Sequence, residues 1–176
     1  MRRTRVKLAI GATVLAVAAT GAAAVAGGGG KTKARLSGFE EVPAIVTDGE
    51  GKLKLNINKS TPSIDYELSY SGLEGGNVRF AHIHIGQRTA NGDVVVFLCG
   101  GGRKPPCPPS GTVTGTITPA DIVPPDATPQ GVEAPTPEEF ADLIRAIRAG
   151  VTYANVHSSK FPGGEIRAQL ERGRGH

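Results

Sequence analysis

The chain has 176 residues, with 20 Lys and Arg against 16 Asp and Glu, which gives a formal net charge of +4. Four of the basic residues and no acidic residue lie in residues 1–26, so the rest of the chain carries 16 charges of each sign. A segment with neither net charge nor a basic cluster lacks the positive field that attracts phosphate backbones, and we therefore expect no nucleic-acid partner. The remaining length of about 150 residues is that of one domain with its own core.

Residues 1–26 have the pattern of a signal peptide that is removed on export. A basic start is followed by an uncharged apolar stretch, and Ala24-Val25-Ala26 forms a small-residue cleavage signature before Gly27. An uncleaved membrane anchor is the alternative, because the uncharged run approaches the ~20 residues that span a bilayer. Its alanine-rich composition favours cleavage. We expect a secreted or extracytoplasmic protein, in the periplasm or at the cell surface, with residues 27–32 as a flexible leader and no membrane contact after cleavage.

Short runs of alternating apolar and polar residues, separated by turn residues, fill most of the chain after residue 32. This pattern predicts an all-β domain over residues 33–170, an antiparallel Greek-key-like sandwich or small barrel of about eight strands, followed by a disordered tail at 171–176. Asn91-Gly92 predicts a tight turn between the fourth and fifth strands, because both residues tolerate positive φ. The expected strands are 33–39, 51–58, 62–71, 77–85, 93–98, 111–118, 151–157 and 165–170.

One helix is expected before the penultimate strand. Thr136 is suited to the N-cap, Pro137 to the first helical position, and Glu139 completes a Thr-x-x-Glu capping box. Gly150 is suited to end the helix. The apolar residues recur at helical spacing and predict a stripe that packs on the sheet: Phe140, Leu143, Ile144 and Ile147.

The two cysteines, Cys99 and Cys107, suit an oxidising compartment, where they would close a short loop by a disulfide. A pair of free or metal-binding thiols is the alternative. Two thiols alone complete no common zinc motif, which favours the disulfide.

Three of the four histidines occur in two strand-like segments, and the fourth, His176, is the last residue. His82 and His84 alternate on one strand, so they project from the same face about 7 Å apart. His157 lies at the end of another predicted strand. Neutral imidazoles bind copper and zinc, so these three histidines are a candidate metal site with copper or zinc as cofactor. The alternative is a structural role, in which they bond neighbouring backbone or carboxylate groups in a half-buried layer.

Five short motifs follow one another along the chain: 36–44 (LSGFEEVPA), 71–73 (SGL), 81–86 (AHIHIG), 153–158 (YANVHS) and 161–170 (FPGGEIRAQL). In this order they resemble the CHRD domain, a family named for repeats in chordin. The resemblance covers about residues 33–170 and implies an extracellular all-β module with no generally established activity. Its partner would be an unidentified extracellular protein or small ligand. Growth-factor binding by chordin is associated with cysteine-rich repeats, which this chain lacks.

The His-x-His pattern is also similar to part of the copper site of copper-zinc superoxide dismutases. A bridging histidine and a separate zinc site would need more ligands than the domain has, so a full dismutase is not expected. Two interpretations remain. The first is a secreted, non-catalytic binding or structural CHRD module, with no catalytic residue assigned. The second is a copper- or zinc-binding protein that uses His82, His84 and His157, either with or without redox activity.

Two further expectations concern charged residues within these motifs. Glu165 and Arg167 alternate with apolar residues and are expected on a solvated strand face beside His157. Glu40 and Glu41 are adjacent, so they are expected to point in opposite directions and not to share a site.

Overall fold

The computed structural model describes residues 30–125 and 129–171; residues 1–26, expected to be the signal peptide, lie outside this range, as does the tail from residue 172. Eight strands, paired antiparallel throughout, form one sheet in the order β5-β4-β7-β8-β1-β2-β3-β6, which confirms the predicted all-β class and strand number. The strands are β1 Gly30–Ser37, β2 Glu50–Ile57, β3 Ile64–Ser71, β4 Val78–Ile85, β5 Val94–Cys99, β6 Gly111–Ile117, β7 Thr152–Ser158 and β8 Ile166–Leu170.

Strand β1 begins at Gly30, before the predicted start at residue 33, so residues 30–32 of the expected leader belong to the strand. It pairs with β2 along its whole length, from Gly30 opposite Ile57 to Ser37 opposite Glu50. Pairing with β2 extends β1 to Gly30, Lys31 and Thr32, which the local sequence pattern does not predict as strand. Phe39 lies in the 3₁₀ helix η1 (Gly38–Glu40), not in the strand.

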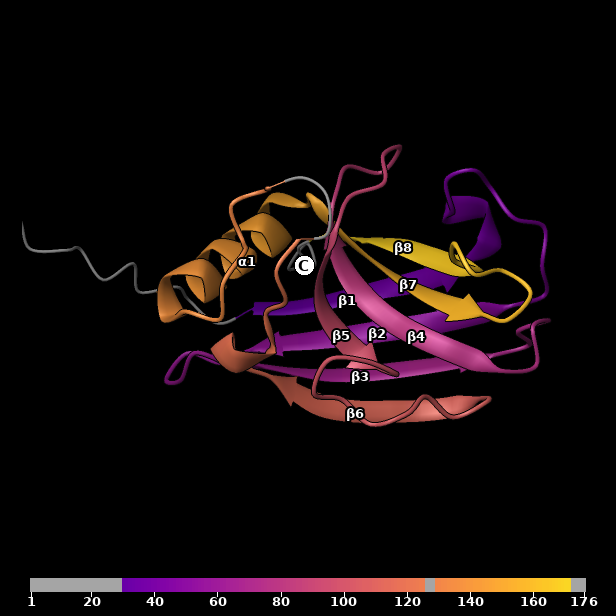
Figure 1. Ribbon diagram of the computed structural model, residues 1–176, viewed down its shortest axis with the longest axis horizontal. Coiled ribbons are helices and arrows are strands. Elements are labelled where there is room, and N and C mark those ends of the chain that lie inside the picture. The colour runs from indigo at the N-terminus through magenta and orange to yellow at the C-terminus, as the bar shows by residue number, and fades with distance from the viewer. Residues whose placement is uncertain (1–29, 126–128, 172–176) are drawn as a thin grey trace, which may run out of the picture.

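The sheet curls so that β4 and β5 lie across the half formed by β1, β2 and β3, giving a nearly closed barrel-like shape (Figure 1). Alternate side chains of each strand point inward and form one apolar core. In β4 the inward residues are Ala81 and Ile83, and in β7 they are Ala154 and Val156, all fully buried. The opposite face of these two strands therefore carries the histidines.

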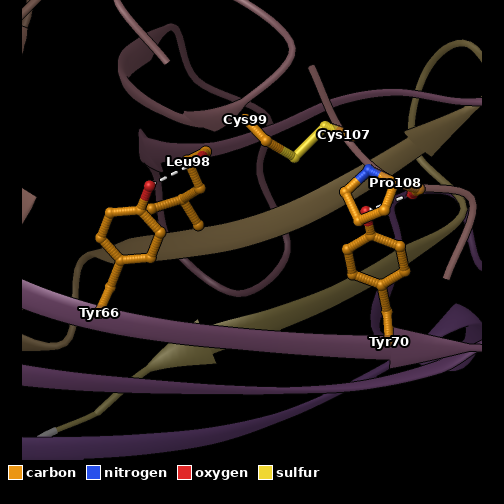
Figure 2. The surroundings of a disulfide bond; sticks show 6 residues. All are labelled: Tyr66, Tyr70, Leu98, Cys99, Cys107 and Pro108. Carbon is orange, nitrogen blue, oxygen red and sulfur yellow. Dashed lines mark hydrogen bonds between the residues drawn. A yellow bond between two sulfur atoms is a disulfide. The ribbon is translucent and has the colours of Figure 1, made fainter. Parts of the chain in front are cut away.

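Two tyrosines on β3 cross the core and hold the sheet closed. The Tyr66 hydroxyl donates to the carbonyl of Leu98 on β5, and the Tyr70 hydroxyl donates to the carbonyl of Pro108, both at 2.7 Å (Figure 2). Between these two contacts lies the Cys99–Cys107 disulfide, which confirms the predicted pairing. The bridge ties the end of β5 to the connection that leads into β6.

The two edge strands, β5 and β6, are also joined by the segment around the 3₁₀ helix η2 (Pro119–Asp121). After η2, the Val123 N–H donates to the Val95 carbonyl on β5 at 3.0 Å. Lys104, from the β5–β6 connection, pairs with Asp121 at 3.0 Å and donates to the Thr116 carbonyl on β6 at 2.7 Å. These contacts leave neither edge free as a long template for another chain.

Helix α1 (Pro137–Ala149) lies at one end of the sheet and precedes β7, as predicted (Figure 1). Thr136 is the N-cap, and Gly150 ends the helix in a left-handed conformation with φ 72°. Glu139 departs from the predicted capping box, because its carboxylate accepts from the backbone N–H of Glu133 and Ala134. Among the described residues, no helix has the length and apolar character needed to cross a membrane.

Candidate functional site

The face of β4, β7 and β8 that points away from the core is polar, yet it is buried. Side chains on this face alternate with core residues such as Ala81, Val156 and Ala168. Each polar side chain on this face is less than 9% exposed, so the expectation of a solvated strand face around Arg167 is wrong. We call this set the outer polar layer: His82, His84, Tyr153, Asn155, His157, Arg167 and Gln169.

Backbone connections cover the outer polar layer and supply carbonyl groups to it. The connection between β4 and β5, residues 86–93, accepts hydrogen bonds from Arg167, His84 and Gln169. The connection between β7 and β8 supplies the carbonyl of Pro162 to His157. Buried polar side chains need such partners, because an unpaired one loses the hydrogen bonds that water would provide.

Asn91-Gly92 does not form the predicted tight turn, because the connection that contains it spans residues 86–93. The turn lies earlier, where the Ala90 N–H donates to the Gln87 carbonyl at 3.0 Å. Gly92 is required for another reason, since a Cβ there would collide with the carbonyl of Ile85. Glycine is therefore required at position 92 by the close approach of two backbone segments and not by a turn.

Arg167 is the largest fully buried side chain, with 1% of its surface exposed. Its Nη1 donates to Asn91 Oδ1 at 2.9 Å, and its Nη2 donates to the carbonyls of Ala90 at 2.8 Å and Gln87 at 3.0 Å, with Arg88 at 3.4 Å. The planar guanidinium presents several N–H groups in a fixed geometry, which suits it to gather carbonyls from one loop. Arg167 therefore fixes the loop 86–93 over the layer.

Tyr153 lies between Arg167 and the histidines. The Arg167 guanidinium carbon is 3.4 Å from the centroid of the Tyr153 ring, and the His84 ring is stacked on Tyr153 at 4.5 Å with an interplanar angle of 3°. These contacts follow from the strand order, since β7 lies between β4 and β8. The cation and the aromatic ring together set the plane of the His84 imidazole.

The structure brings His82, His84 and His157 together. The ring centroids of His82 and His84 are 5.2 Å apart, and those of His82 and His157 are 4.7 Å apart. One ring nitrogen from each histidine lies within 4.8 Å of the others. An ion about 2 Å from each nitrogen would keep the nitrogens within ~4 Å of one another. The imidazole nitrogens would therefore have to move toward one another by less than about 1 Å to bind one ion.

Backbone carbonyls orient two of the three rings. His157 Nδ1 lies 2.9 Å from the Pro162 carbonyl, which only accepts, so Nδ1 carries the proton and Nε2 carries the lone pair. His84 has the Gly92 carbonyl 2.9 Å from Nδ1 and Asn155 Oδ1 3.0 Å from Nε2. A neutral ring has one N–H and can satisfy only one of these two acceptors.

Burial keeps the three imidazoles uncharged. It lowers the pKa of His82 to about 3, and the nearby His157 and His84 rings lower that pKa further. It lowers the pKa of His84 to about 4, against the opposing effect of the Gly92 carbonyl. Burial also lowers the pKa of His157. The neutral imidazole is the form that offers a lone pair to a metal ion.

Glu41 also enters this region, directly after η1. Its side chain is buried, and burial raises its pKa to about 7, although Arg167 and Asn155 act in the opposite direction. Gly164, with φ 127°, permits the approach, because a Cβ there would collide with Glu41 Oε1 and lie 2.8 Å from Asn155 Nδ2. Glu40 pairs instead with Arg88, so the two glutamates have separate surroundings, as predicted.

Glu165 is buried as well, but it does not share partners with Arg167. Its Oε1 accepts from the Thr47 hydroxyl and from the Glu74 N–H, both at 2.7 Å. Sequence reasoning missed Glu41, Tyr153 and Asn155 as members of the site. The available signal was their position in the two motifs 36–44 and 153–158, which the fold places on either side of β8.

Comparisons with known proteins give one finding. A family model described as CHRD domain matches residues 32–170, nearly all of the described chain. No curated protein and no solved structure was found to match the chain.

Replacing Arg167 by lysine tests its role in the layer. Arg167→Lys keeps the charge but removes the fork of N–H groups, so several buried carbonyls lose their donor. We expect a loss of about 2–4 kcal/mol in the free energy of unfolding, measured by chemical denaturation. The matched control is Arg145→Lys, whose side chain is 79% exposed and should change stability by less than ~0.5 kcal/mol. Equal, small losses in both variants would contradict the role given to Arg167.

Proposed function

The chain belongs to the CHRD domain family, and we propose that it acts as an exported, non-catalytic binding or structural module. The observation that carries the proposal is the internal bonding of the outer polar layer. Arg167 and Gln169 donate hydrogen bonds to backbone carbonyls of the same chain. Groups held in this way stabilise a connection and have little freedom to move protons for a substrate.

The disulfide supports the exported location. Cys99 and Cys107 are bridged, and such bridges persist in oxidising compartments outside the cytosol. The bridge closes a loop with a sequence separation of 8 residues, which contributes roughly 2–3 kcal/mol by restricting the unfolded chain.

Mass spectrometry of the protein collected outside the cytoplasm tests this location. We expect an N-terminus near Gly27 and a mass two hydrogens below that of the reduced chain, with no cysteine alkylated before reduction. A chain that keeps residues 1–26 in the cell membrane, or two cysteines alkylated in the native protein, would contradict the proposal.

A three-histidine metal site is the second candidate function, and a specific observation favours it. His82 Nδ1 and His157 Nε2 are buried and have no hydrogen-bond partner among the described residues. An unpaired buried nitrogen is costly, and a bound cation would satisfy both at once.

The surroundings suit this candidate in two further ways. The Nδ1–H of His157 donates to a backbone carbonyl, which is how proteins orient metal-ligating imidazoles. The donor set contains nitrogen and no thiolate, which suits copper or zinc. Three protein ligands would leave a coordination position open for exchange of a further ligand.

Metal analysis of the untagged protein tests the site. After reconstitution with zinc or copper and desalting, we expect one equivalent of metal by elemental analysis. His82→Ala/His84→Ala and His157→Ala should each weaken binding by about 100-fold or more, since even partners of the ligands change affinity 10–100-fold. Circular dichroism checks that the variants are folded.

The control is His176→Ala, which removes the one histidine outside the described residues. It should keep the full equivalent of metal. Absence of stoichiometric metal in the reconstituted parent protein, or loss of metal only in His176→Ala, would overturn the metal site. Neither result would change the argument for export.

A further inference from the structure

Helix α1 covers one end of the sheet (Figure 1). A groove of about 620 Å³ runs between α1 and the connection from β2 to β3. None of the residues of the outer polar layer lines it. Its volume falls within the roughly 300–1,000 Å³ typical of small-molecule sites.

The floor of the groove is apolar. Ile57 from β2 and Phe140 from α1 lie beneath it and are buried, and the apolar side chains that remain accessible include Pro62, Ala141 and Ile144. Ile144 differs from the rest of the helix stripe, because Phe140, Leu143 and Ile147 are buried in the core whereas Ile144 is only partly covered. The groove is therefore where the predicted apolar stripe of α1 lacks a complete partner.

The rim of the groove carries charge of one sign. Among the described residues that line it, the charged side chains are Lys59, Arg145 and Arg148, which are all basic. Arg145 pairs with Asp142 at 2.9 Å, but its side chain is 79% exposed, and such a surface pair contributes little to stability. Arg145 can therefore turn toward an anion in the groove at small cost.

We propose that this groove binds a single-chain amphiphilic carboxylate, a molecule of the fatty-acid type. The hydrocarbon chain would lie on Ile144, Ala141 and Pro62, and the carboxylate would face Lys59 and Arg145. Guanidinium and ammonium groups form charge-assisted hydrogen bonds with carboxylates, while burial of each methylene contributes about 0.8 kcal/mol. Charge complementarity at the rim selects this occupant over a neutral apolar one.

Isothermal titration calorimetry of the purified protein with dodecanoate, below its micelle-forming concentration, tests the proposal. We expect saturable binding with a stoichiometry of one. Dodecanol, which has the same chain and no charge, should bind at least about tenfold more weakly, and dodecylamine more weakly still. Equal affinity for the three compounds, or no binding of dodecanoate, would overturn the proposal.

Charge-reversal variants locate the site. Lys59→Glu/Arg145→Glu changes two exposed residues of the rim and should weaken dodecanoate binding by about tenfold, equivalent to ~1.4 kcal/mol. Lys52→Glu/Arg103→Glu makes the same change in net charge at exposed residues outside the groove and should leave binding unchanged. Equal weakening in both pairs would contradict a located site and indicate a general effect of charge.

Ile144→Asp tests the floor and identifies other occupants. It should abolish dodecanoate binding while the far-ultraviolet circular dichroism stays unchanged. Sedimentation of the parent protein should show a monomer at all concentrations. A dimer that Ile144→Asp dissociates would assign the groove to a second copy of the chain and overturn the proposal.

Discussion

The buried guanidinium of Arg167 joins parts of the chain that lie far apart in sequence. From β8 it bonds the carbonyls of the loop 86–93 and lies against the Tyr153 ring on β7. Tyr153 in turn stacks on His84 of β4, so one side chain sets the position of both a loop and an imidazole. Because a guanidinium stays charged when buried, its carbonyl partners must remain in place, which makes the loop a fixed part of the fold.

The sheet is consequently buried on both faces in the region of β4, β7 and β8. One face packs against the apolar core, and the other carries the outer polar layer under its loops. Low polarity on the core side and limited access on the other side raise the energy of any new charge, which is why three adjacent imidazoles stay neutral and Glu41 takes up a proton more readily than usual. The shifted pKa values result from the loops that cover this face, since the same residues on a solvated strand would have their usual pKa values.

The elements with strong local signals were predictable from sequence. Thr136, Pro137 and Gly150 bound helix α1 as expected, and the alternating runs placed the eight strands within a few residues. The burial of Arg167 was not predictable, because alternation distinguishes two faces without showing that a distant loop covers one of them. Asn91-Gly92 was misassigned for a related reason. Gly92 is needed because the backbone of Ile85 passes close to it, and Asn91 accepts a hydrogen bond from Arg167. Both partners are known only from the tertiary fold.

The central claim is that the outer polar layer holds neutral imidazoles, with the proton of His157 on Nδ1. Nitrogen-15 chemical shifts of the histidine rings, followed from pH 7.5 to about pH 5, test it most directly. The account predicts an Nδ1–H tautomer for His157, and no charging of His82 or His84 in this range, since their pKa values are about 3 and 4. The unfolded chain would take up these protons near pH 6.5, so stability should fall as the pH drops below that value. Ordinary titration of His82 and His84 near pH 6.5, or an Nε2–H tautomer of His157, would contradict the account.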